Sequence, residues 1–539
     1  MKINLLPLVI YLIVLAAFPP SNSPDGKTLP LKDMAYTLAD SSGVKVSAYD
    51  FGEGDLKNSG GKRVPCPLDG IIAVPEGSGP YPLVIVFHGV TRVKNVYDKV
   101  YSGFDYLVAQ LAAEGYVAVS FNVNIEYHCW DYGESRMFDW AYQVYKQQIA
   151  LLQRANNGQE SGHGVDLQGK IDFSQINLIG HSCGGEMADL IIRKEQDEGL
   201  NRIRSLVRVQ ATTLIYDDPF PDVPTGIIIG EFDGDVPEAG QYVFDELQKQ
   251  QGRFSPASIV YLQGANHAFF NRCFIKDEAR SQTNRLTRKQ QEDFLAHYTC
   301  AFLSVYAKGR ERGQCENRFG IWDVTEPQPV TMFGYAVTAS SLTPERLALF
   351  IPSEDGVPHL APSSEASVAF ISKTSRDGIW FRHPGASYVA DKELPLYAIR
   401  WNEIGGTVSF NCMQDNPTDF SAYSALSLFV AVDSSDALNP KGEAQSFTVA
   451  LIDATGTKQS VLIPKGTSAL AYHDGRIVEI KEFDGTITRY WDGYMPLGEL
   501  RIPLSYFDGI NLSKVTELLI ELDQTDTGAV MLSGIYLVK

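Results

Sequence analysis

The stretch INLIGHSCGGE at residues 176–186 decides the fold. It opens with a short apolar run, turns through Gly180, Ser182 and Gly184, and continues into helical spacing over 186–196. A G-x-S-x-G pattern between a strand and a helix is typical of a nucleophile elbow, which exposes a strained serine hydroxyl. The flanking glycines leave room for the turn, because a Cβ there would clash. The stretch predicts such an elbow with Ser182 as nucleophile; the alternative is an ordinary glycine-rich turn.

Similar apolar runs recur on both sides of this stretch. They are short, lack polar alternation and are rich in β-branched residues, which is typical of buried parallel strands. They occupy residues 83–87, 117–121, 226–230 and 258–262. Segments with helical spacing separate them, and a closing helix is expected over 288–308. The pattern predicts an α/β fold with a doubly wound, mostly parallel sheet.

A serine nucleophile needs a base, and the base needs a carboxylate that orients it. Asp233 follows one of the predicted strands, and His267 follows the next. The chain order Ser, Asp, His is the order expected of an α/β-hydrolase. Loops at the carboxyl ends of parallel strands gather at one edge of a sheet. We therefore expect a triad of Ser182, Asp233 and His267, with Asp235 as the alternative acid.

The loop after the first strong strand has a different expected role. In this architecture it supplies one backbone N–H of the oxyanion hole, here assigned to Val90, and the second comes from Cys183. For His88 we favour a packed histidine that shapes the loop over a role in proton transfer. The aromatic-rich segment 124–145 follows another strand. We favour helix core over a substrate-binding wall for its aromatic side chains.

These motifs together resemble a known family. The chain is similar to the dienelactone hydrolase and chlorophyllase/platelet-activating-factor acetylhydrolase branch of the α/β-hydrolases, with bacterial cutinase-like polyester hydrolases as relatives. The resemblance covers about residues 64–310. It is carried by His88-Gly89, EGYVAV at 114–119, residues 171–185, the Asp233 turn and HAFF at 267–270. It implies hydrolysis of carboxylic esters without a cofactor. The cysteine nucleophile of dienelactone hydrolase itself is not matched, because Cys183 lies one place after Ser182.

The texture of the chain changes after about residue 320. Alternating strands are separated by short turns, and helical spacing is nearly absent. We expect a catalytic domain at 24–318 and an all-β domain at 319–539, built as a jelly-roll-like sandwich with an irregular lead-in at 333–385. The second domain faintly resembles carbohydrate-binding jelly rolls through 511–513 and 535–537, so a polysaccharide or a surface is its candidate ligand. This domain contains Trp380, Trp401 and Trp491. Their rings could stack on sugars, but we favour a place in the core of the sandwich, because that is the commoner role of such tryptophans.

The N-terminus has the features of a signal peptide. Lys2 precedes an uncharged apolar run at residues 5–18, which is short for a membrane span. Residues 1–23 are therefore expected to direct export to a periplasmic or extracellular location, leaving no stable membrane span; the alternative is an uncleaved anchor. An exported chain can keep disulfides, and its seven cysteines suggest two pairings as guesses, Cys300 with Cys315 and Cys129 with Cys273.

Composition narrows the function classes. Lys and Arg number 46 against 65 Asp and Glu, which gives −19 and argues against nucleic acid as a partner. No C-x-x-C occurs, and we find no support for a metal or cofactor. We expect a secreted serine hydrolase that cleaves carboxylic esters, small or polymeric, through an acyl-enzyme. The alternatives are a peptidase or amidase with the same triad, and a glycan- or surface-binding protein on a hydrolase scaffold.

Overall fold

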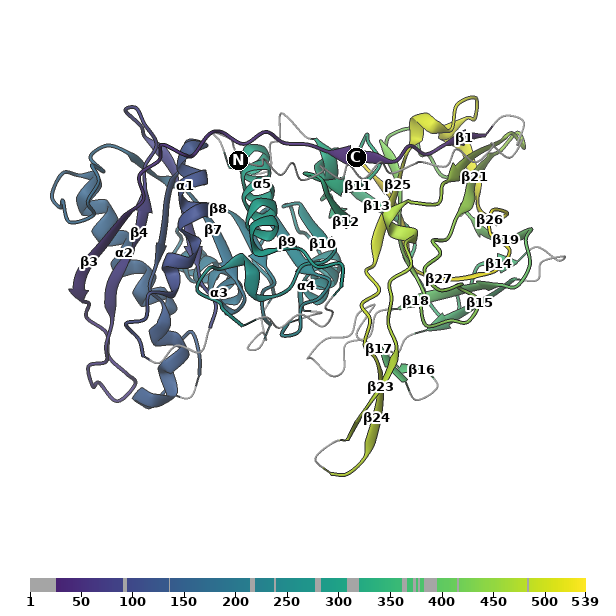
Figure 1. Ribbon diagram of the computed structural model, residues 1–539. Coiled ribbons are helices and arrows are strands. Elements are labelled where there is room, and N and C mark those ends of the chain that lie inside the picture. Colours follow the sequence, from purple (N-terminus) through teal and green to yellow (C-terminus); the bar gives the residue numbers. More distant parts are fainter. Residues whose placement is uncertain are drawn as a thin grey trace, which may run out of the picture.

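A computed structural model describes most of the chain from residue 26 to residue 539 (Figure 1). The expected signal peptide at 1–23 and Cys315 lie outside the described residues. The segments left out are 1–25, 91–94, 135, 214–218, 237–238, 277–282, 308–318, 361–365, 372–374, 377–378, 382–394, 414–415 and 482–483. Among the described residues, no helix combines the length and the apolarity needed to cross a membrane.

The larger sheet has eleven strands in the order β2-β11-β12-β10-β9-β8-β7-β5-β6-β4-β3. Its six central strands, from β10 to β6 in this order, are parallel. Its first eight members in chain order after β2 are β3 (Ser47–Glu53), β4 (Pro67–Ala73), β5 (Tyr81–Phe87), β6 (Val117–Phe121), β7 (Ile171–His181), β8 (Ile203–Val209), β9 (Thr225–Gly230) and β10 (Ala257–Leu262). Burial of both faces explains the unbroken apolar runs that predicted the central strands.

Helices cover both faces of this sheet. On one face α1 (Asp105–Ala113) and α5 (Arg288–Tyr306) share a hydrophobic cluster with the strands. On the other face α2 (Ala141–Asn156) and α3 (Cys183–Asp197) share a second cluster, and α4 (Ala239–Lys249) packs against β9 and β10. The predicted doubly wound α/β fold is therefore confirmed.

Two strands beyond residue 319 also belong to the larger sheet. β12 (Tyr335–Leu342) pairs antiparallel with β10 over its whole length, and β11 (Pro329–Met332) pairs with β12. β2 (Lys32–Met34) completes this edge by pairing with β11. The sheet therefore extends past the boundary expected at residues 318 and 319. The expected irregular lead-in at 333–385 is wrong where the structure describes it, because strands occupy much of it.

The rest of the described chain is strand-rich, as predicted. One six-stranded sheet has the order β1-β22-β21-β26-β19-β14, and another has β15-β18-β27-β20-β25 with β13 beside β27. Side chains from both sheets meet in one hydrophobic cluster. The first sheet contains β1 (Lys27–Thr28), β14 (His359–Leu360), β19 (Gly406–Asn411), β21 (Phe447–Asp453), β22 (Lys458–Ile463) and β26 (Val515–Leu522). The second contains β13 (Arg346–Phe350), β15 (Ala366–Ile371), β18 (Leu396–Trp401), β20 (Ala425–Val432), β25 (Gly498–Pro503) and β27 (Gly528–Val538).

A small sheet projects from this region as an arm (Figure 1). It contains β16 (Ser375–Arg376), β17 (Ile379–Phe381), β23 (Ile477–Lys481) and β24 (Ile487–Trp491). Trp401 is buried in the cluster of the two six-stranded sheets, as expected of sandwich core. Trp491 is buried in a different cluster, which includes side chains of α4, β9 and β10, so the expected sandwich-core role is wrong for it. The side chain of Trp380 lies outside what the structure describes.

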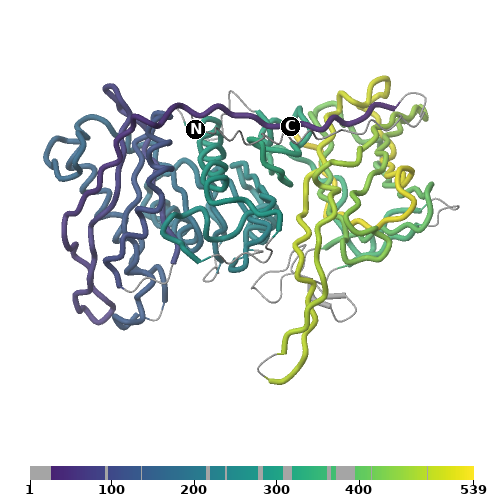
Figure 2. Tube along the Cα trace, viewed as in Figure 1, coloured from purple at the N-terminus to yellow at the C-terminus, as the bar shows by residue number. Residues whose placement is uncertain are grey.

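The N-terminal segment links the two parts of the chain. In Figure 2 its purple trace runs along the top of the molecule from the strand-rich part to the far side of the larger sheet. Its strands join three partners in turn, since β1 pairs with β22, β2 with β11 and β3 with β4. The suggested disulfide between Cys129 and Cys273 is wrong. Both are free thiols, and Cys129 is packed inside the core on the α2 and α3 face.

Candidate active site

The elbow serine lies between β7 and α3. Ser182 has φ 56° and ψ −131°, a backbone conformation that residues other than glycine rarely adopt. Such strain is typical of residues held in place for function. Glycine is required at the surrounding positions because neighbouring atoms lie too close to leave room for a Cβ, and not because of the backbone dihedral angles there. A Cβ on Gly180 would come 2.4 Å from the Gly184 carbonyl oxygen, and one on Gly89 would come 2.4 Å from the Ser182 Cβ.

The turn after β9 places Asp233 beside His267. Its Oδ2 lies 2.9 Å from the His267 Nδ1, and both residues are buried. Its Oδ1 accepts hydrogen bonds from the backbone amides of Asp235 and Val236, each at 2.7 Å. Burial alone would raise the pKa of Asp233, but His267 and these amides outweigh it and hold the pKa below its ordinary value. The carboxylate is therefore ionised and fixed in orientation.

Asp235 occupies a different position around the same ring. Its Oδ2 lies 3.7 Å from the His267 Nε2, and its side chain is 57% exposed. Asp233 thus holds the ring nitrogen that a triad acid binds, while Asp235 lies near the nitrogen that faces a substrate. Of the two candidate acids, the geometry favours Asp233.

His181, inside the elbow, contacts the loop that carries His267. Its Nε2 lies 2.9 Å from the His267 carbonyl oxygen, and the two rings are 5.0 Å apart. Burial, followed by the charge of His267, lowers the pKa of His181 to about 3, so the ring is neutral and donates through Nε2. Gln210 donates from the other side to the Asn266 carbonyl at 3.0 Å. Sequence reasoning missed both contacts, because nothing in the sequence shows where these side chains point.

The two residues expected to form the oxyanion hole, Val90 and Cys183, lie close to each other. Cys183 is the first residue of α3, where backbone N–H groups favour negative charge. The Val90 amide lies near the Cys183 sulfur, where it opposes the effect of burial on the thiol. Burial nevertheless raises the pKa of Cys183 to about 11. Cys183 is therefore a protonated thiol at neutral pH, which makes it a poor nucleophile.

His88 has the packed role that we favoured. Its Nε2 accepts from the Val123 amide at 3.2 Å, and its Nδ1 lies 2.9 Å from the Gly89 carbonyl oxygen. Burial lowers its pKa to about 4, so it stays neutral. The Tyr127 hydroxyl donates to the His88 carbonyl at 2.6 Å and thereby fixes the loop that precedes Val90.

The aromatic residues of segment 124–145 lie mostly in the core around this loop, with Trp130 as an exposed exception. The buried members are Tyr127, Phe138, Trp140, Tyr142 and Tyr145. Within the described residues, no group of three or more His, Cys, Asp or Glu side chains is arranged to hold a metal ion.

The comparisons with known proteins give one family match. No curated protein matches the chain. Residues 68–299 match the model of the dienelactone hydrolase family, and this span contains the elbow, the acid turn, the histidine loop and both oxyanion candidates. The match includes the parallel core of the larger sheet and most of α5. The hydrolase part of this chain, residues 68–299, therefore belongs to the dienelactone hydrolase family of α/β-hydrolases.

Proposed function

We propose that this protein is a secreted serine hydrolase that cleaves carboxylic esters through an acyl-enzyme. One observation carries the proposal: the buried hydrogen bond of 2.9 Å between Asp233 and His267 at the same sheet edge as the strained Ser182. A carboxylate that orients an imidazole beside an activated serine is the arrangement used for nucleophilic acyl transfer. The family match supports a hydrolase and leaves the bond to be cleaved open.

The chemistry follows from the positions of these groups. His267 takes the proton of the Ser182 hydroxyl as that oxygen attacks the ester carbonyl carbon. The imidazolium that forms is stabilised by the ionised Asp233 at Nδ1. The carbonyl carbon becomes tetrahedral as the π electrons move to its oxygen, which forms an oxyanion. The C=O bond then re-forms, the ester C–O bond breaks, and Nε2 gives the proton to the oxygen of the leaving alcohol. Water repeats the sequence on the acyl-enzyme, releases the acid and restores Ser182.

The oxyanion is assigned to the backbone amides of Val90 and Cys183. Removal of one such donor typically costs about 10²–10³ in kcat. The neutral His88 ring and the Tyr127 hydroxyl bond to the backbone carbonyls of Gly89 and His88, which precede Val90. They are therefore positioning residues rather than proton carriers. The high pKa of the Cys183 thiol favours Ser182 as the nucleophile.

The proposal includes an accessory role for the strand-rich part. We propose that it is a β-sandwich, because its two larger sheets share one hydrophobic cluster. We also propose that it binds a polysaccharide or another surface, on the resemblance of residues 511–513 and 535–537 to carbohydrate-binding jelly rolls. Export rests on the apolar run at residues 5–18. It is tested by the mass of the protein recovered from the periplasm and the medium, where loss of about the first 23 residues is expected and an intact N-terminus would contradict it.

The catalytic proposal is tested with p-nitrophenyl esters from acetyl to palmitoyl, using the wild type and Ser182→Ala. Turnover is expected in the wild type and should vanish in the variant, while circular dichroism shows that both are folded. The chain-length optimum then measures the acyl pocket. No ester turnover by a folded wild type would overturn the proposal. Cleavage of p-nitroanilide substrates in that case would indicate an amidase, and its absence would favour a binding protein.

A further inference from the structure

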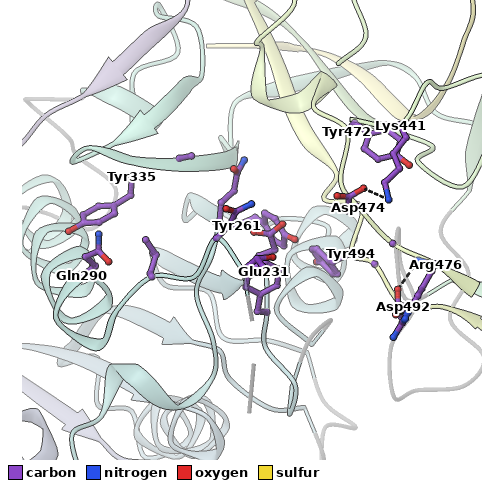
Figure 3. Close-up of a pocket in the computed structure, with 18 of the residues that line it drawn as sticks. Glu231, Tyr261, Gln290, Tyr335, Lys441, Tyr472, Asp474, Arg476, Asp492 and Tyr494 are labelled. Carbon is purple, nitrogen blue, oxygen red and sulfur yellow. Dashed lines mark hydrogen bonds and ion pairs between the residues drawn. The ribbon is translucent and has the colours of Figure 1, made fainter. Parts of the chain in front are cut away.

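A cavity of about 760 Å³ lies between the larger sheet and the strand-rich part (Figure 3). Glu231, Gln263 and Tyr335 line it from the side of the larger sheet, and Asp474 and Arg476 line it from the other side. Ser182 and His267 are not among its lining residues. Its volume is in the range of about 300–1,000 Å³ that is usual for small-molecule sites, which often lie at domain interfaces.

The two walls are held together by direct contacts. Tyr261 of β10 stacks on Tyr494 with ring centroids 4.8 Å apart and an interplanar angle of 15°. The His473 ring also packs on Tyr261, with ring centroids 5.4 Å apart and an interplanar angle of 90°. All three residues are buried. The cavity is therefore preformed, and a ligand does not have to bring its walls together before binding.

The lining is more polar than that of a typical ligand pocket. Among the described lining residues, only Phe232, Leu286 and Ala336 contribute purely apolar side chains. Apart from three glycines, the others offer amides, hydroxyls, carboxylates and cationic groups, which can both donate and accept hydrogen bonds. This fits a ligand that carries many hydrogen-bonding groups. An acyl chain would find few apolar side chains to contact.

Charge narrows the class of ligand further. Lys441 Nζ lies 3.6 Å from Asp474, and Arg476 Nε lies 3.2 Å from Asp492, as the dashed lines in Figure 3 mark. The remaining charged residue of the described lining is Glu231, whose pKa is raised by burial despite the hydrogen bond from the Gly264 amide. Both lining cations already pair with lining carboxylates, so a phosphorylated or carboxylated ligand would have to compete with Asp474 and Asp492 for them, whereas a neutral ligand would not.

Two further tyrosines of the lining, Tyr335 and Tyr472, are partly exposed. The Tyr335 hydroxyl donates to Asp293 at 2.9 Å, and the Tyr472 hydroxyl donates to the Ser434 carbonyl at 3.2 Å. These bonds hold two aromatic side chains in place among the polar groups of the lining. A pyranose ring has the matching character, because its C–H face is apolar and its hydroxyls both donate and accept.

We propose that this cavity is a binding site for a neutral oligosaccharide. It is separate from the triad but shares a wall with it. The Gly264 amide donates to the Glu231 carboxylate at 2.8 Å, and the Phe232 amide donates to the Ala265 carbonyl at 2.7 Å. A variant at Glu231 would therefore disturb the loop that carries His267. Asp474 and Tyr472 lie on the opposite wall and make better test positions.

The test is isothermal titration calorimetry of the full-length protein with xylohexaose, cellohexaose, mannohexaose and maltohexaose. At least one is expected to bind saturably. Asp474→Asn and Tyr472→Ala should each weaken that binding about tenfold or more, because each removes a contact to the ligand. Asp508→Asn is the matched control: its carboxylate and that of Asp474 are both 72% exposed and ion-paired, but Asp508 lies outside the cavity. Its affinity should stay within about twofold of wild type.

Three results would overturn the proposal. The first is no saturable binding of any of the four hexaoses at millimolar concentration. The second is binding that neither Asp474→Asn nor Tyr472→Ala weakens, which would place the ligand elsewhere. The third is binding of tetraglycine, in place of the hexaoses, that both variants abolish, which would make the cavity a peptide site. None of these readouts depends on ester turnover, so the catalytic proposal and this one fail separately.

Discussion

The Asp233→Asn substitution tests the triad most sharply, because the structure dictates how the new amide must lie. Oδ1 of Asp233 accepts from the backbone amides of Asp235 and Val236, each at 2.7 Å. An asparagine keeps these bonds only with its oxygen in that position. Its NH₂ group then points at the His267 Nδ1, which lies 2.9 Å from the other oxygen in the wild type. The ring must accept at Nδ1 and carry its proton on Nε2, the wrong tautomer for a base.

The expected loss follows from this tautomer. The matching substitution in Ser-His-Asp triads lowers kcat by about 10⁴. That factor corresponds to about 5 kcal/mol of lost transition-state stabilisation. The assay is p-nitrophenyl acetate hydrolysis at pH 8, with kcat and KM measured separately. KM should change little, because Asp233 is buried behind the ring and contacts no substrate.

Asp235→Asn is the matched control. Its carboxylate is exposed and 3.7 Å from the His267 Nε2, so it supports no tautomer, and we expect kcat within about tenfold of wild type. The reasoning is refuted if Asp233→Asn keeps kcat within tenfold while folded. It is also refuted if Asp235→Asn costs as much as Asp233→Asn, since the acid would then be Asp235.

Three further predictions concern the supports of the site and of the fold. Tyr127→Phe removes the bond of 2.6 Å to the His88 carbonyl, in the loop assigned to the oxyanion, and should lower kcat about tenfold, with little change in KM, in the same ester assay. Gly89→Ala places a Cβ 2.4 Å from the Cβ of the elbow serine and should lower kcat by about 10² or more, whereas Gly43→Ala, where the Cβ meets open space, should change nothing. Arg501→Met breaks a fully buried pair with Glu499 and should cost about 3–5 kcal/mol in urea unfolding. Burial would raise the pKa of Glu499, but Arg501 and hydrogen bonds hold this pKa below its ordinary value. The stability of the wild type should therefore fall as the pH drops below about 4, where Glu499 becomes protonated. The Arg501→Met variant should lose this pH dependence of stability.

The central strands are predictable because each is a local apolar run. Residues 83–87 lie within β5, and residues 258–262 lie within β10. β8 is the exception, since Ser205 and Arg208 interrupt its apolar pattern. Both are nevertheless buried: Ser205 bonds to Asn177 at 2.8 Å, and Arg208 pairs with Asp189 of α3. A buried polar residue with a distant partner has no signature in the sequence.

Long-range pairing explains the other differences. β12 joins β10 after an intervening helix, and the N-terminal strand β2 joins β11 from nearly three hundred residues away. Neither contact follows from local patterning, because an edge position depends on which strand is left unpaired once the rest of the sheet has formed. The boundary at residue 319 was predicted from the change in sequence pattern. That change comes before the end of the larger sheet, which still includes β11 and β12.

The site was predictable to the extent that it depends on strand ends. Asp233 and His267 follow neighbouring parallel strands, and the structure places them in hydrogen-bond contact. The choice between Asp233 and Asp235 depends on the path of a tight turn, which spacing alone leaves open. His181 and Tyr127 were beyond reach for the same reason, since their roles depend on the directions of their side chains.

The most direct test of the central claim is the site of covalent labelling by a fluorophosphonate, mapped by mass spectrometry of the digested protein. The reagent reacts with a serine only when that serine is activated by a base. The account predicts one time-dependent adduct on Ser182 in the wild type, and none on that peptide in a folded His267→Ala variant. An adduct on another residue, or ester turnover by an enzyme whose Ser182 is never labelled, would contradict it.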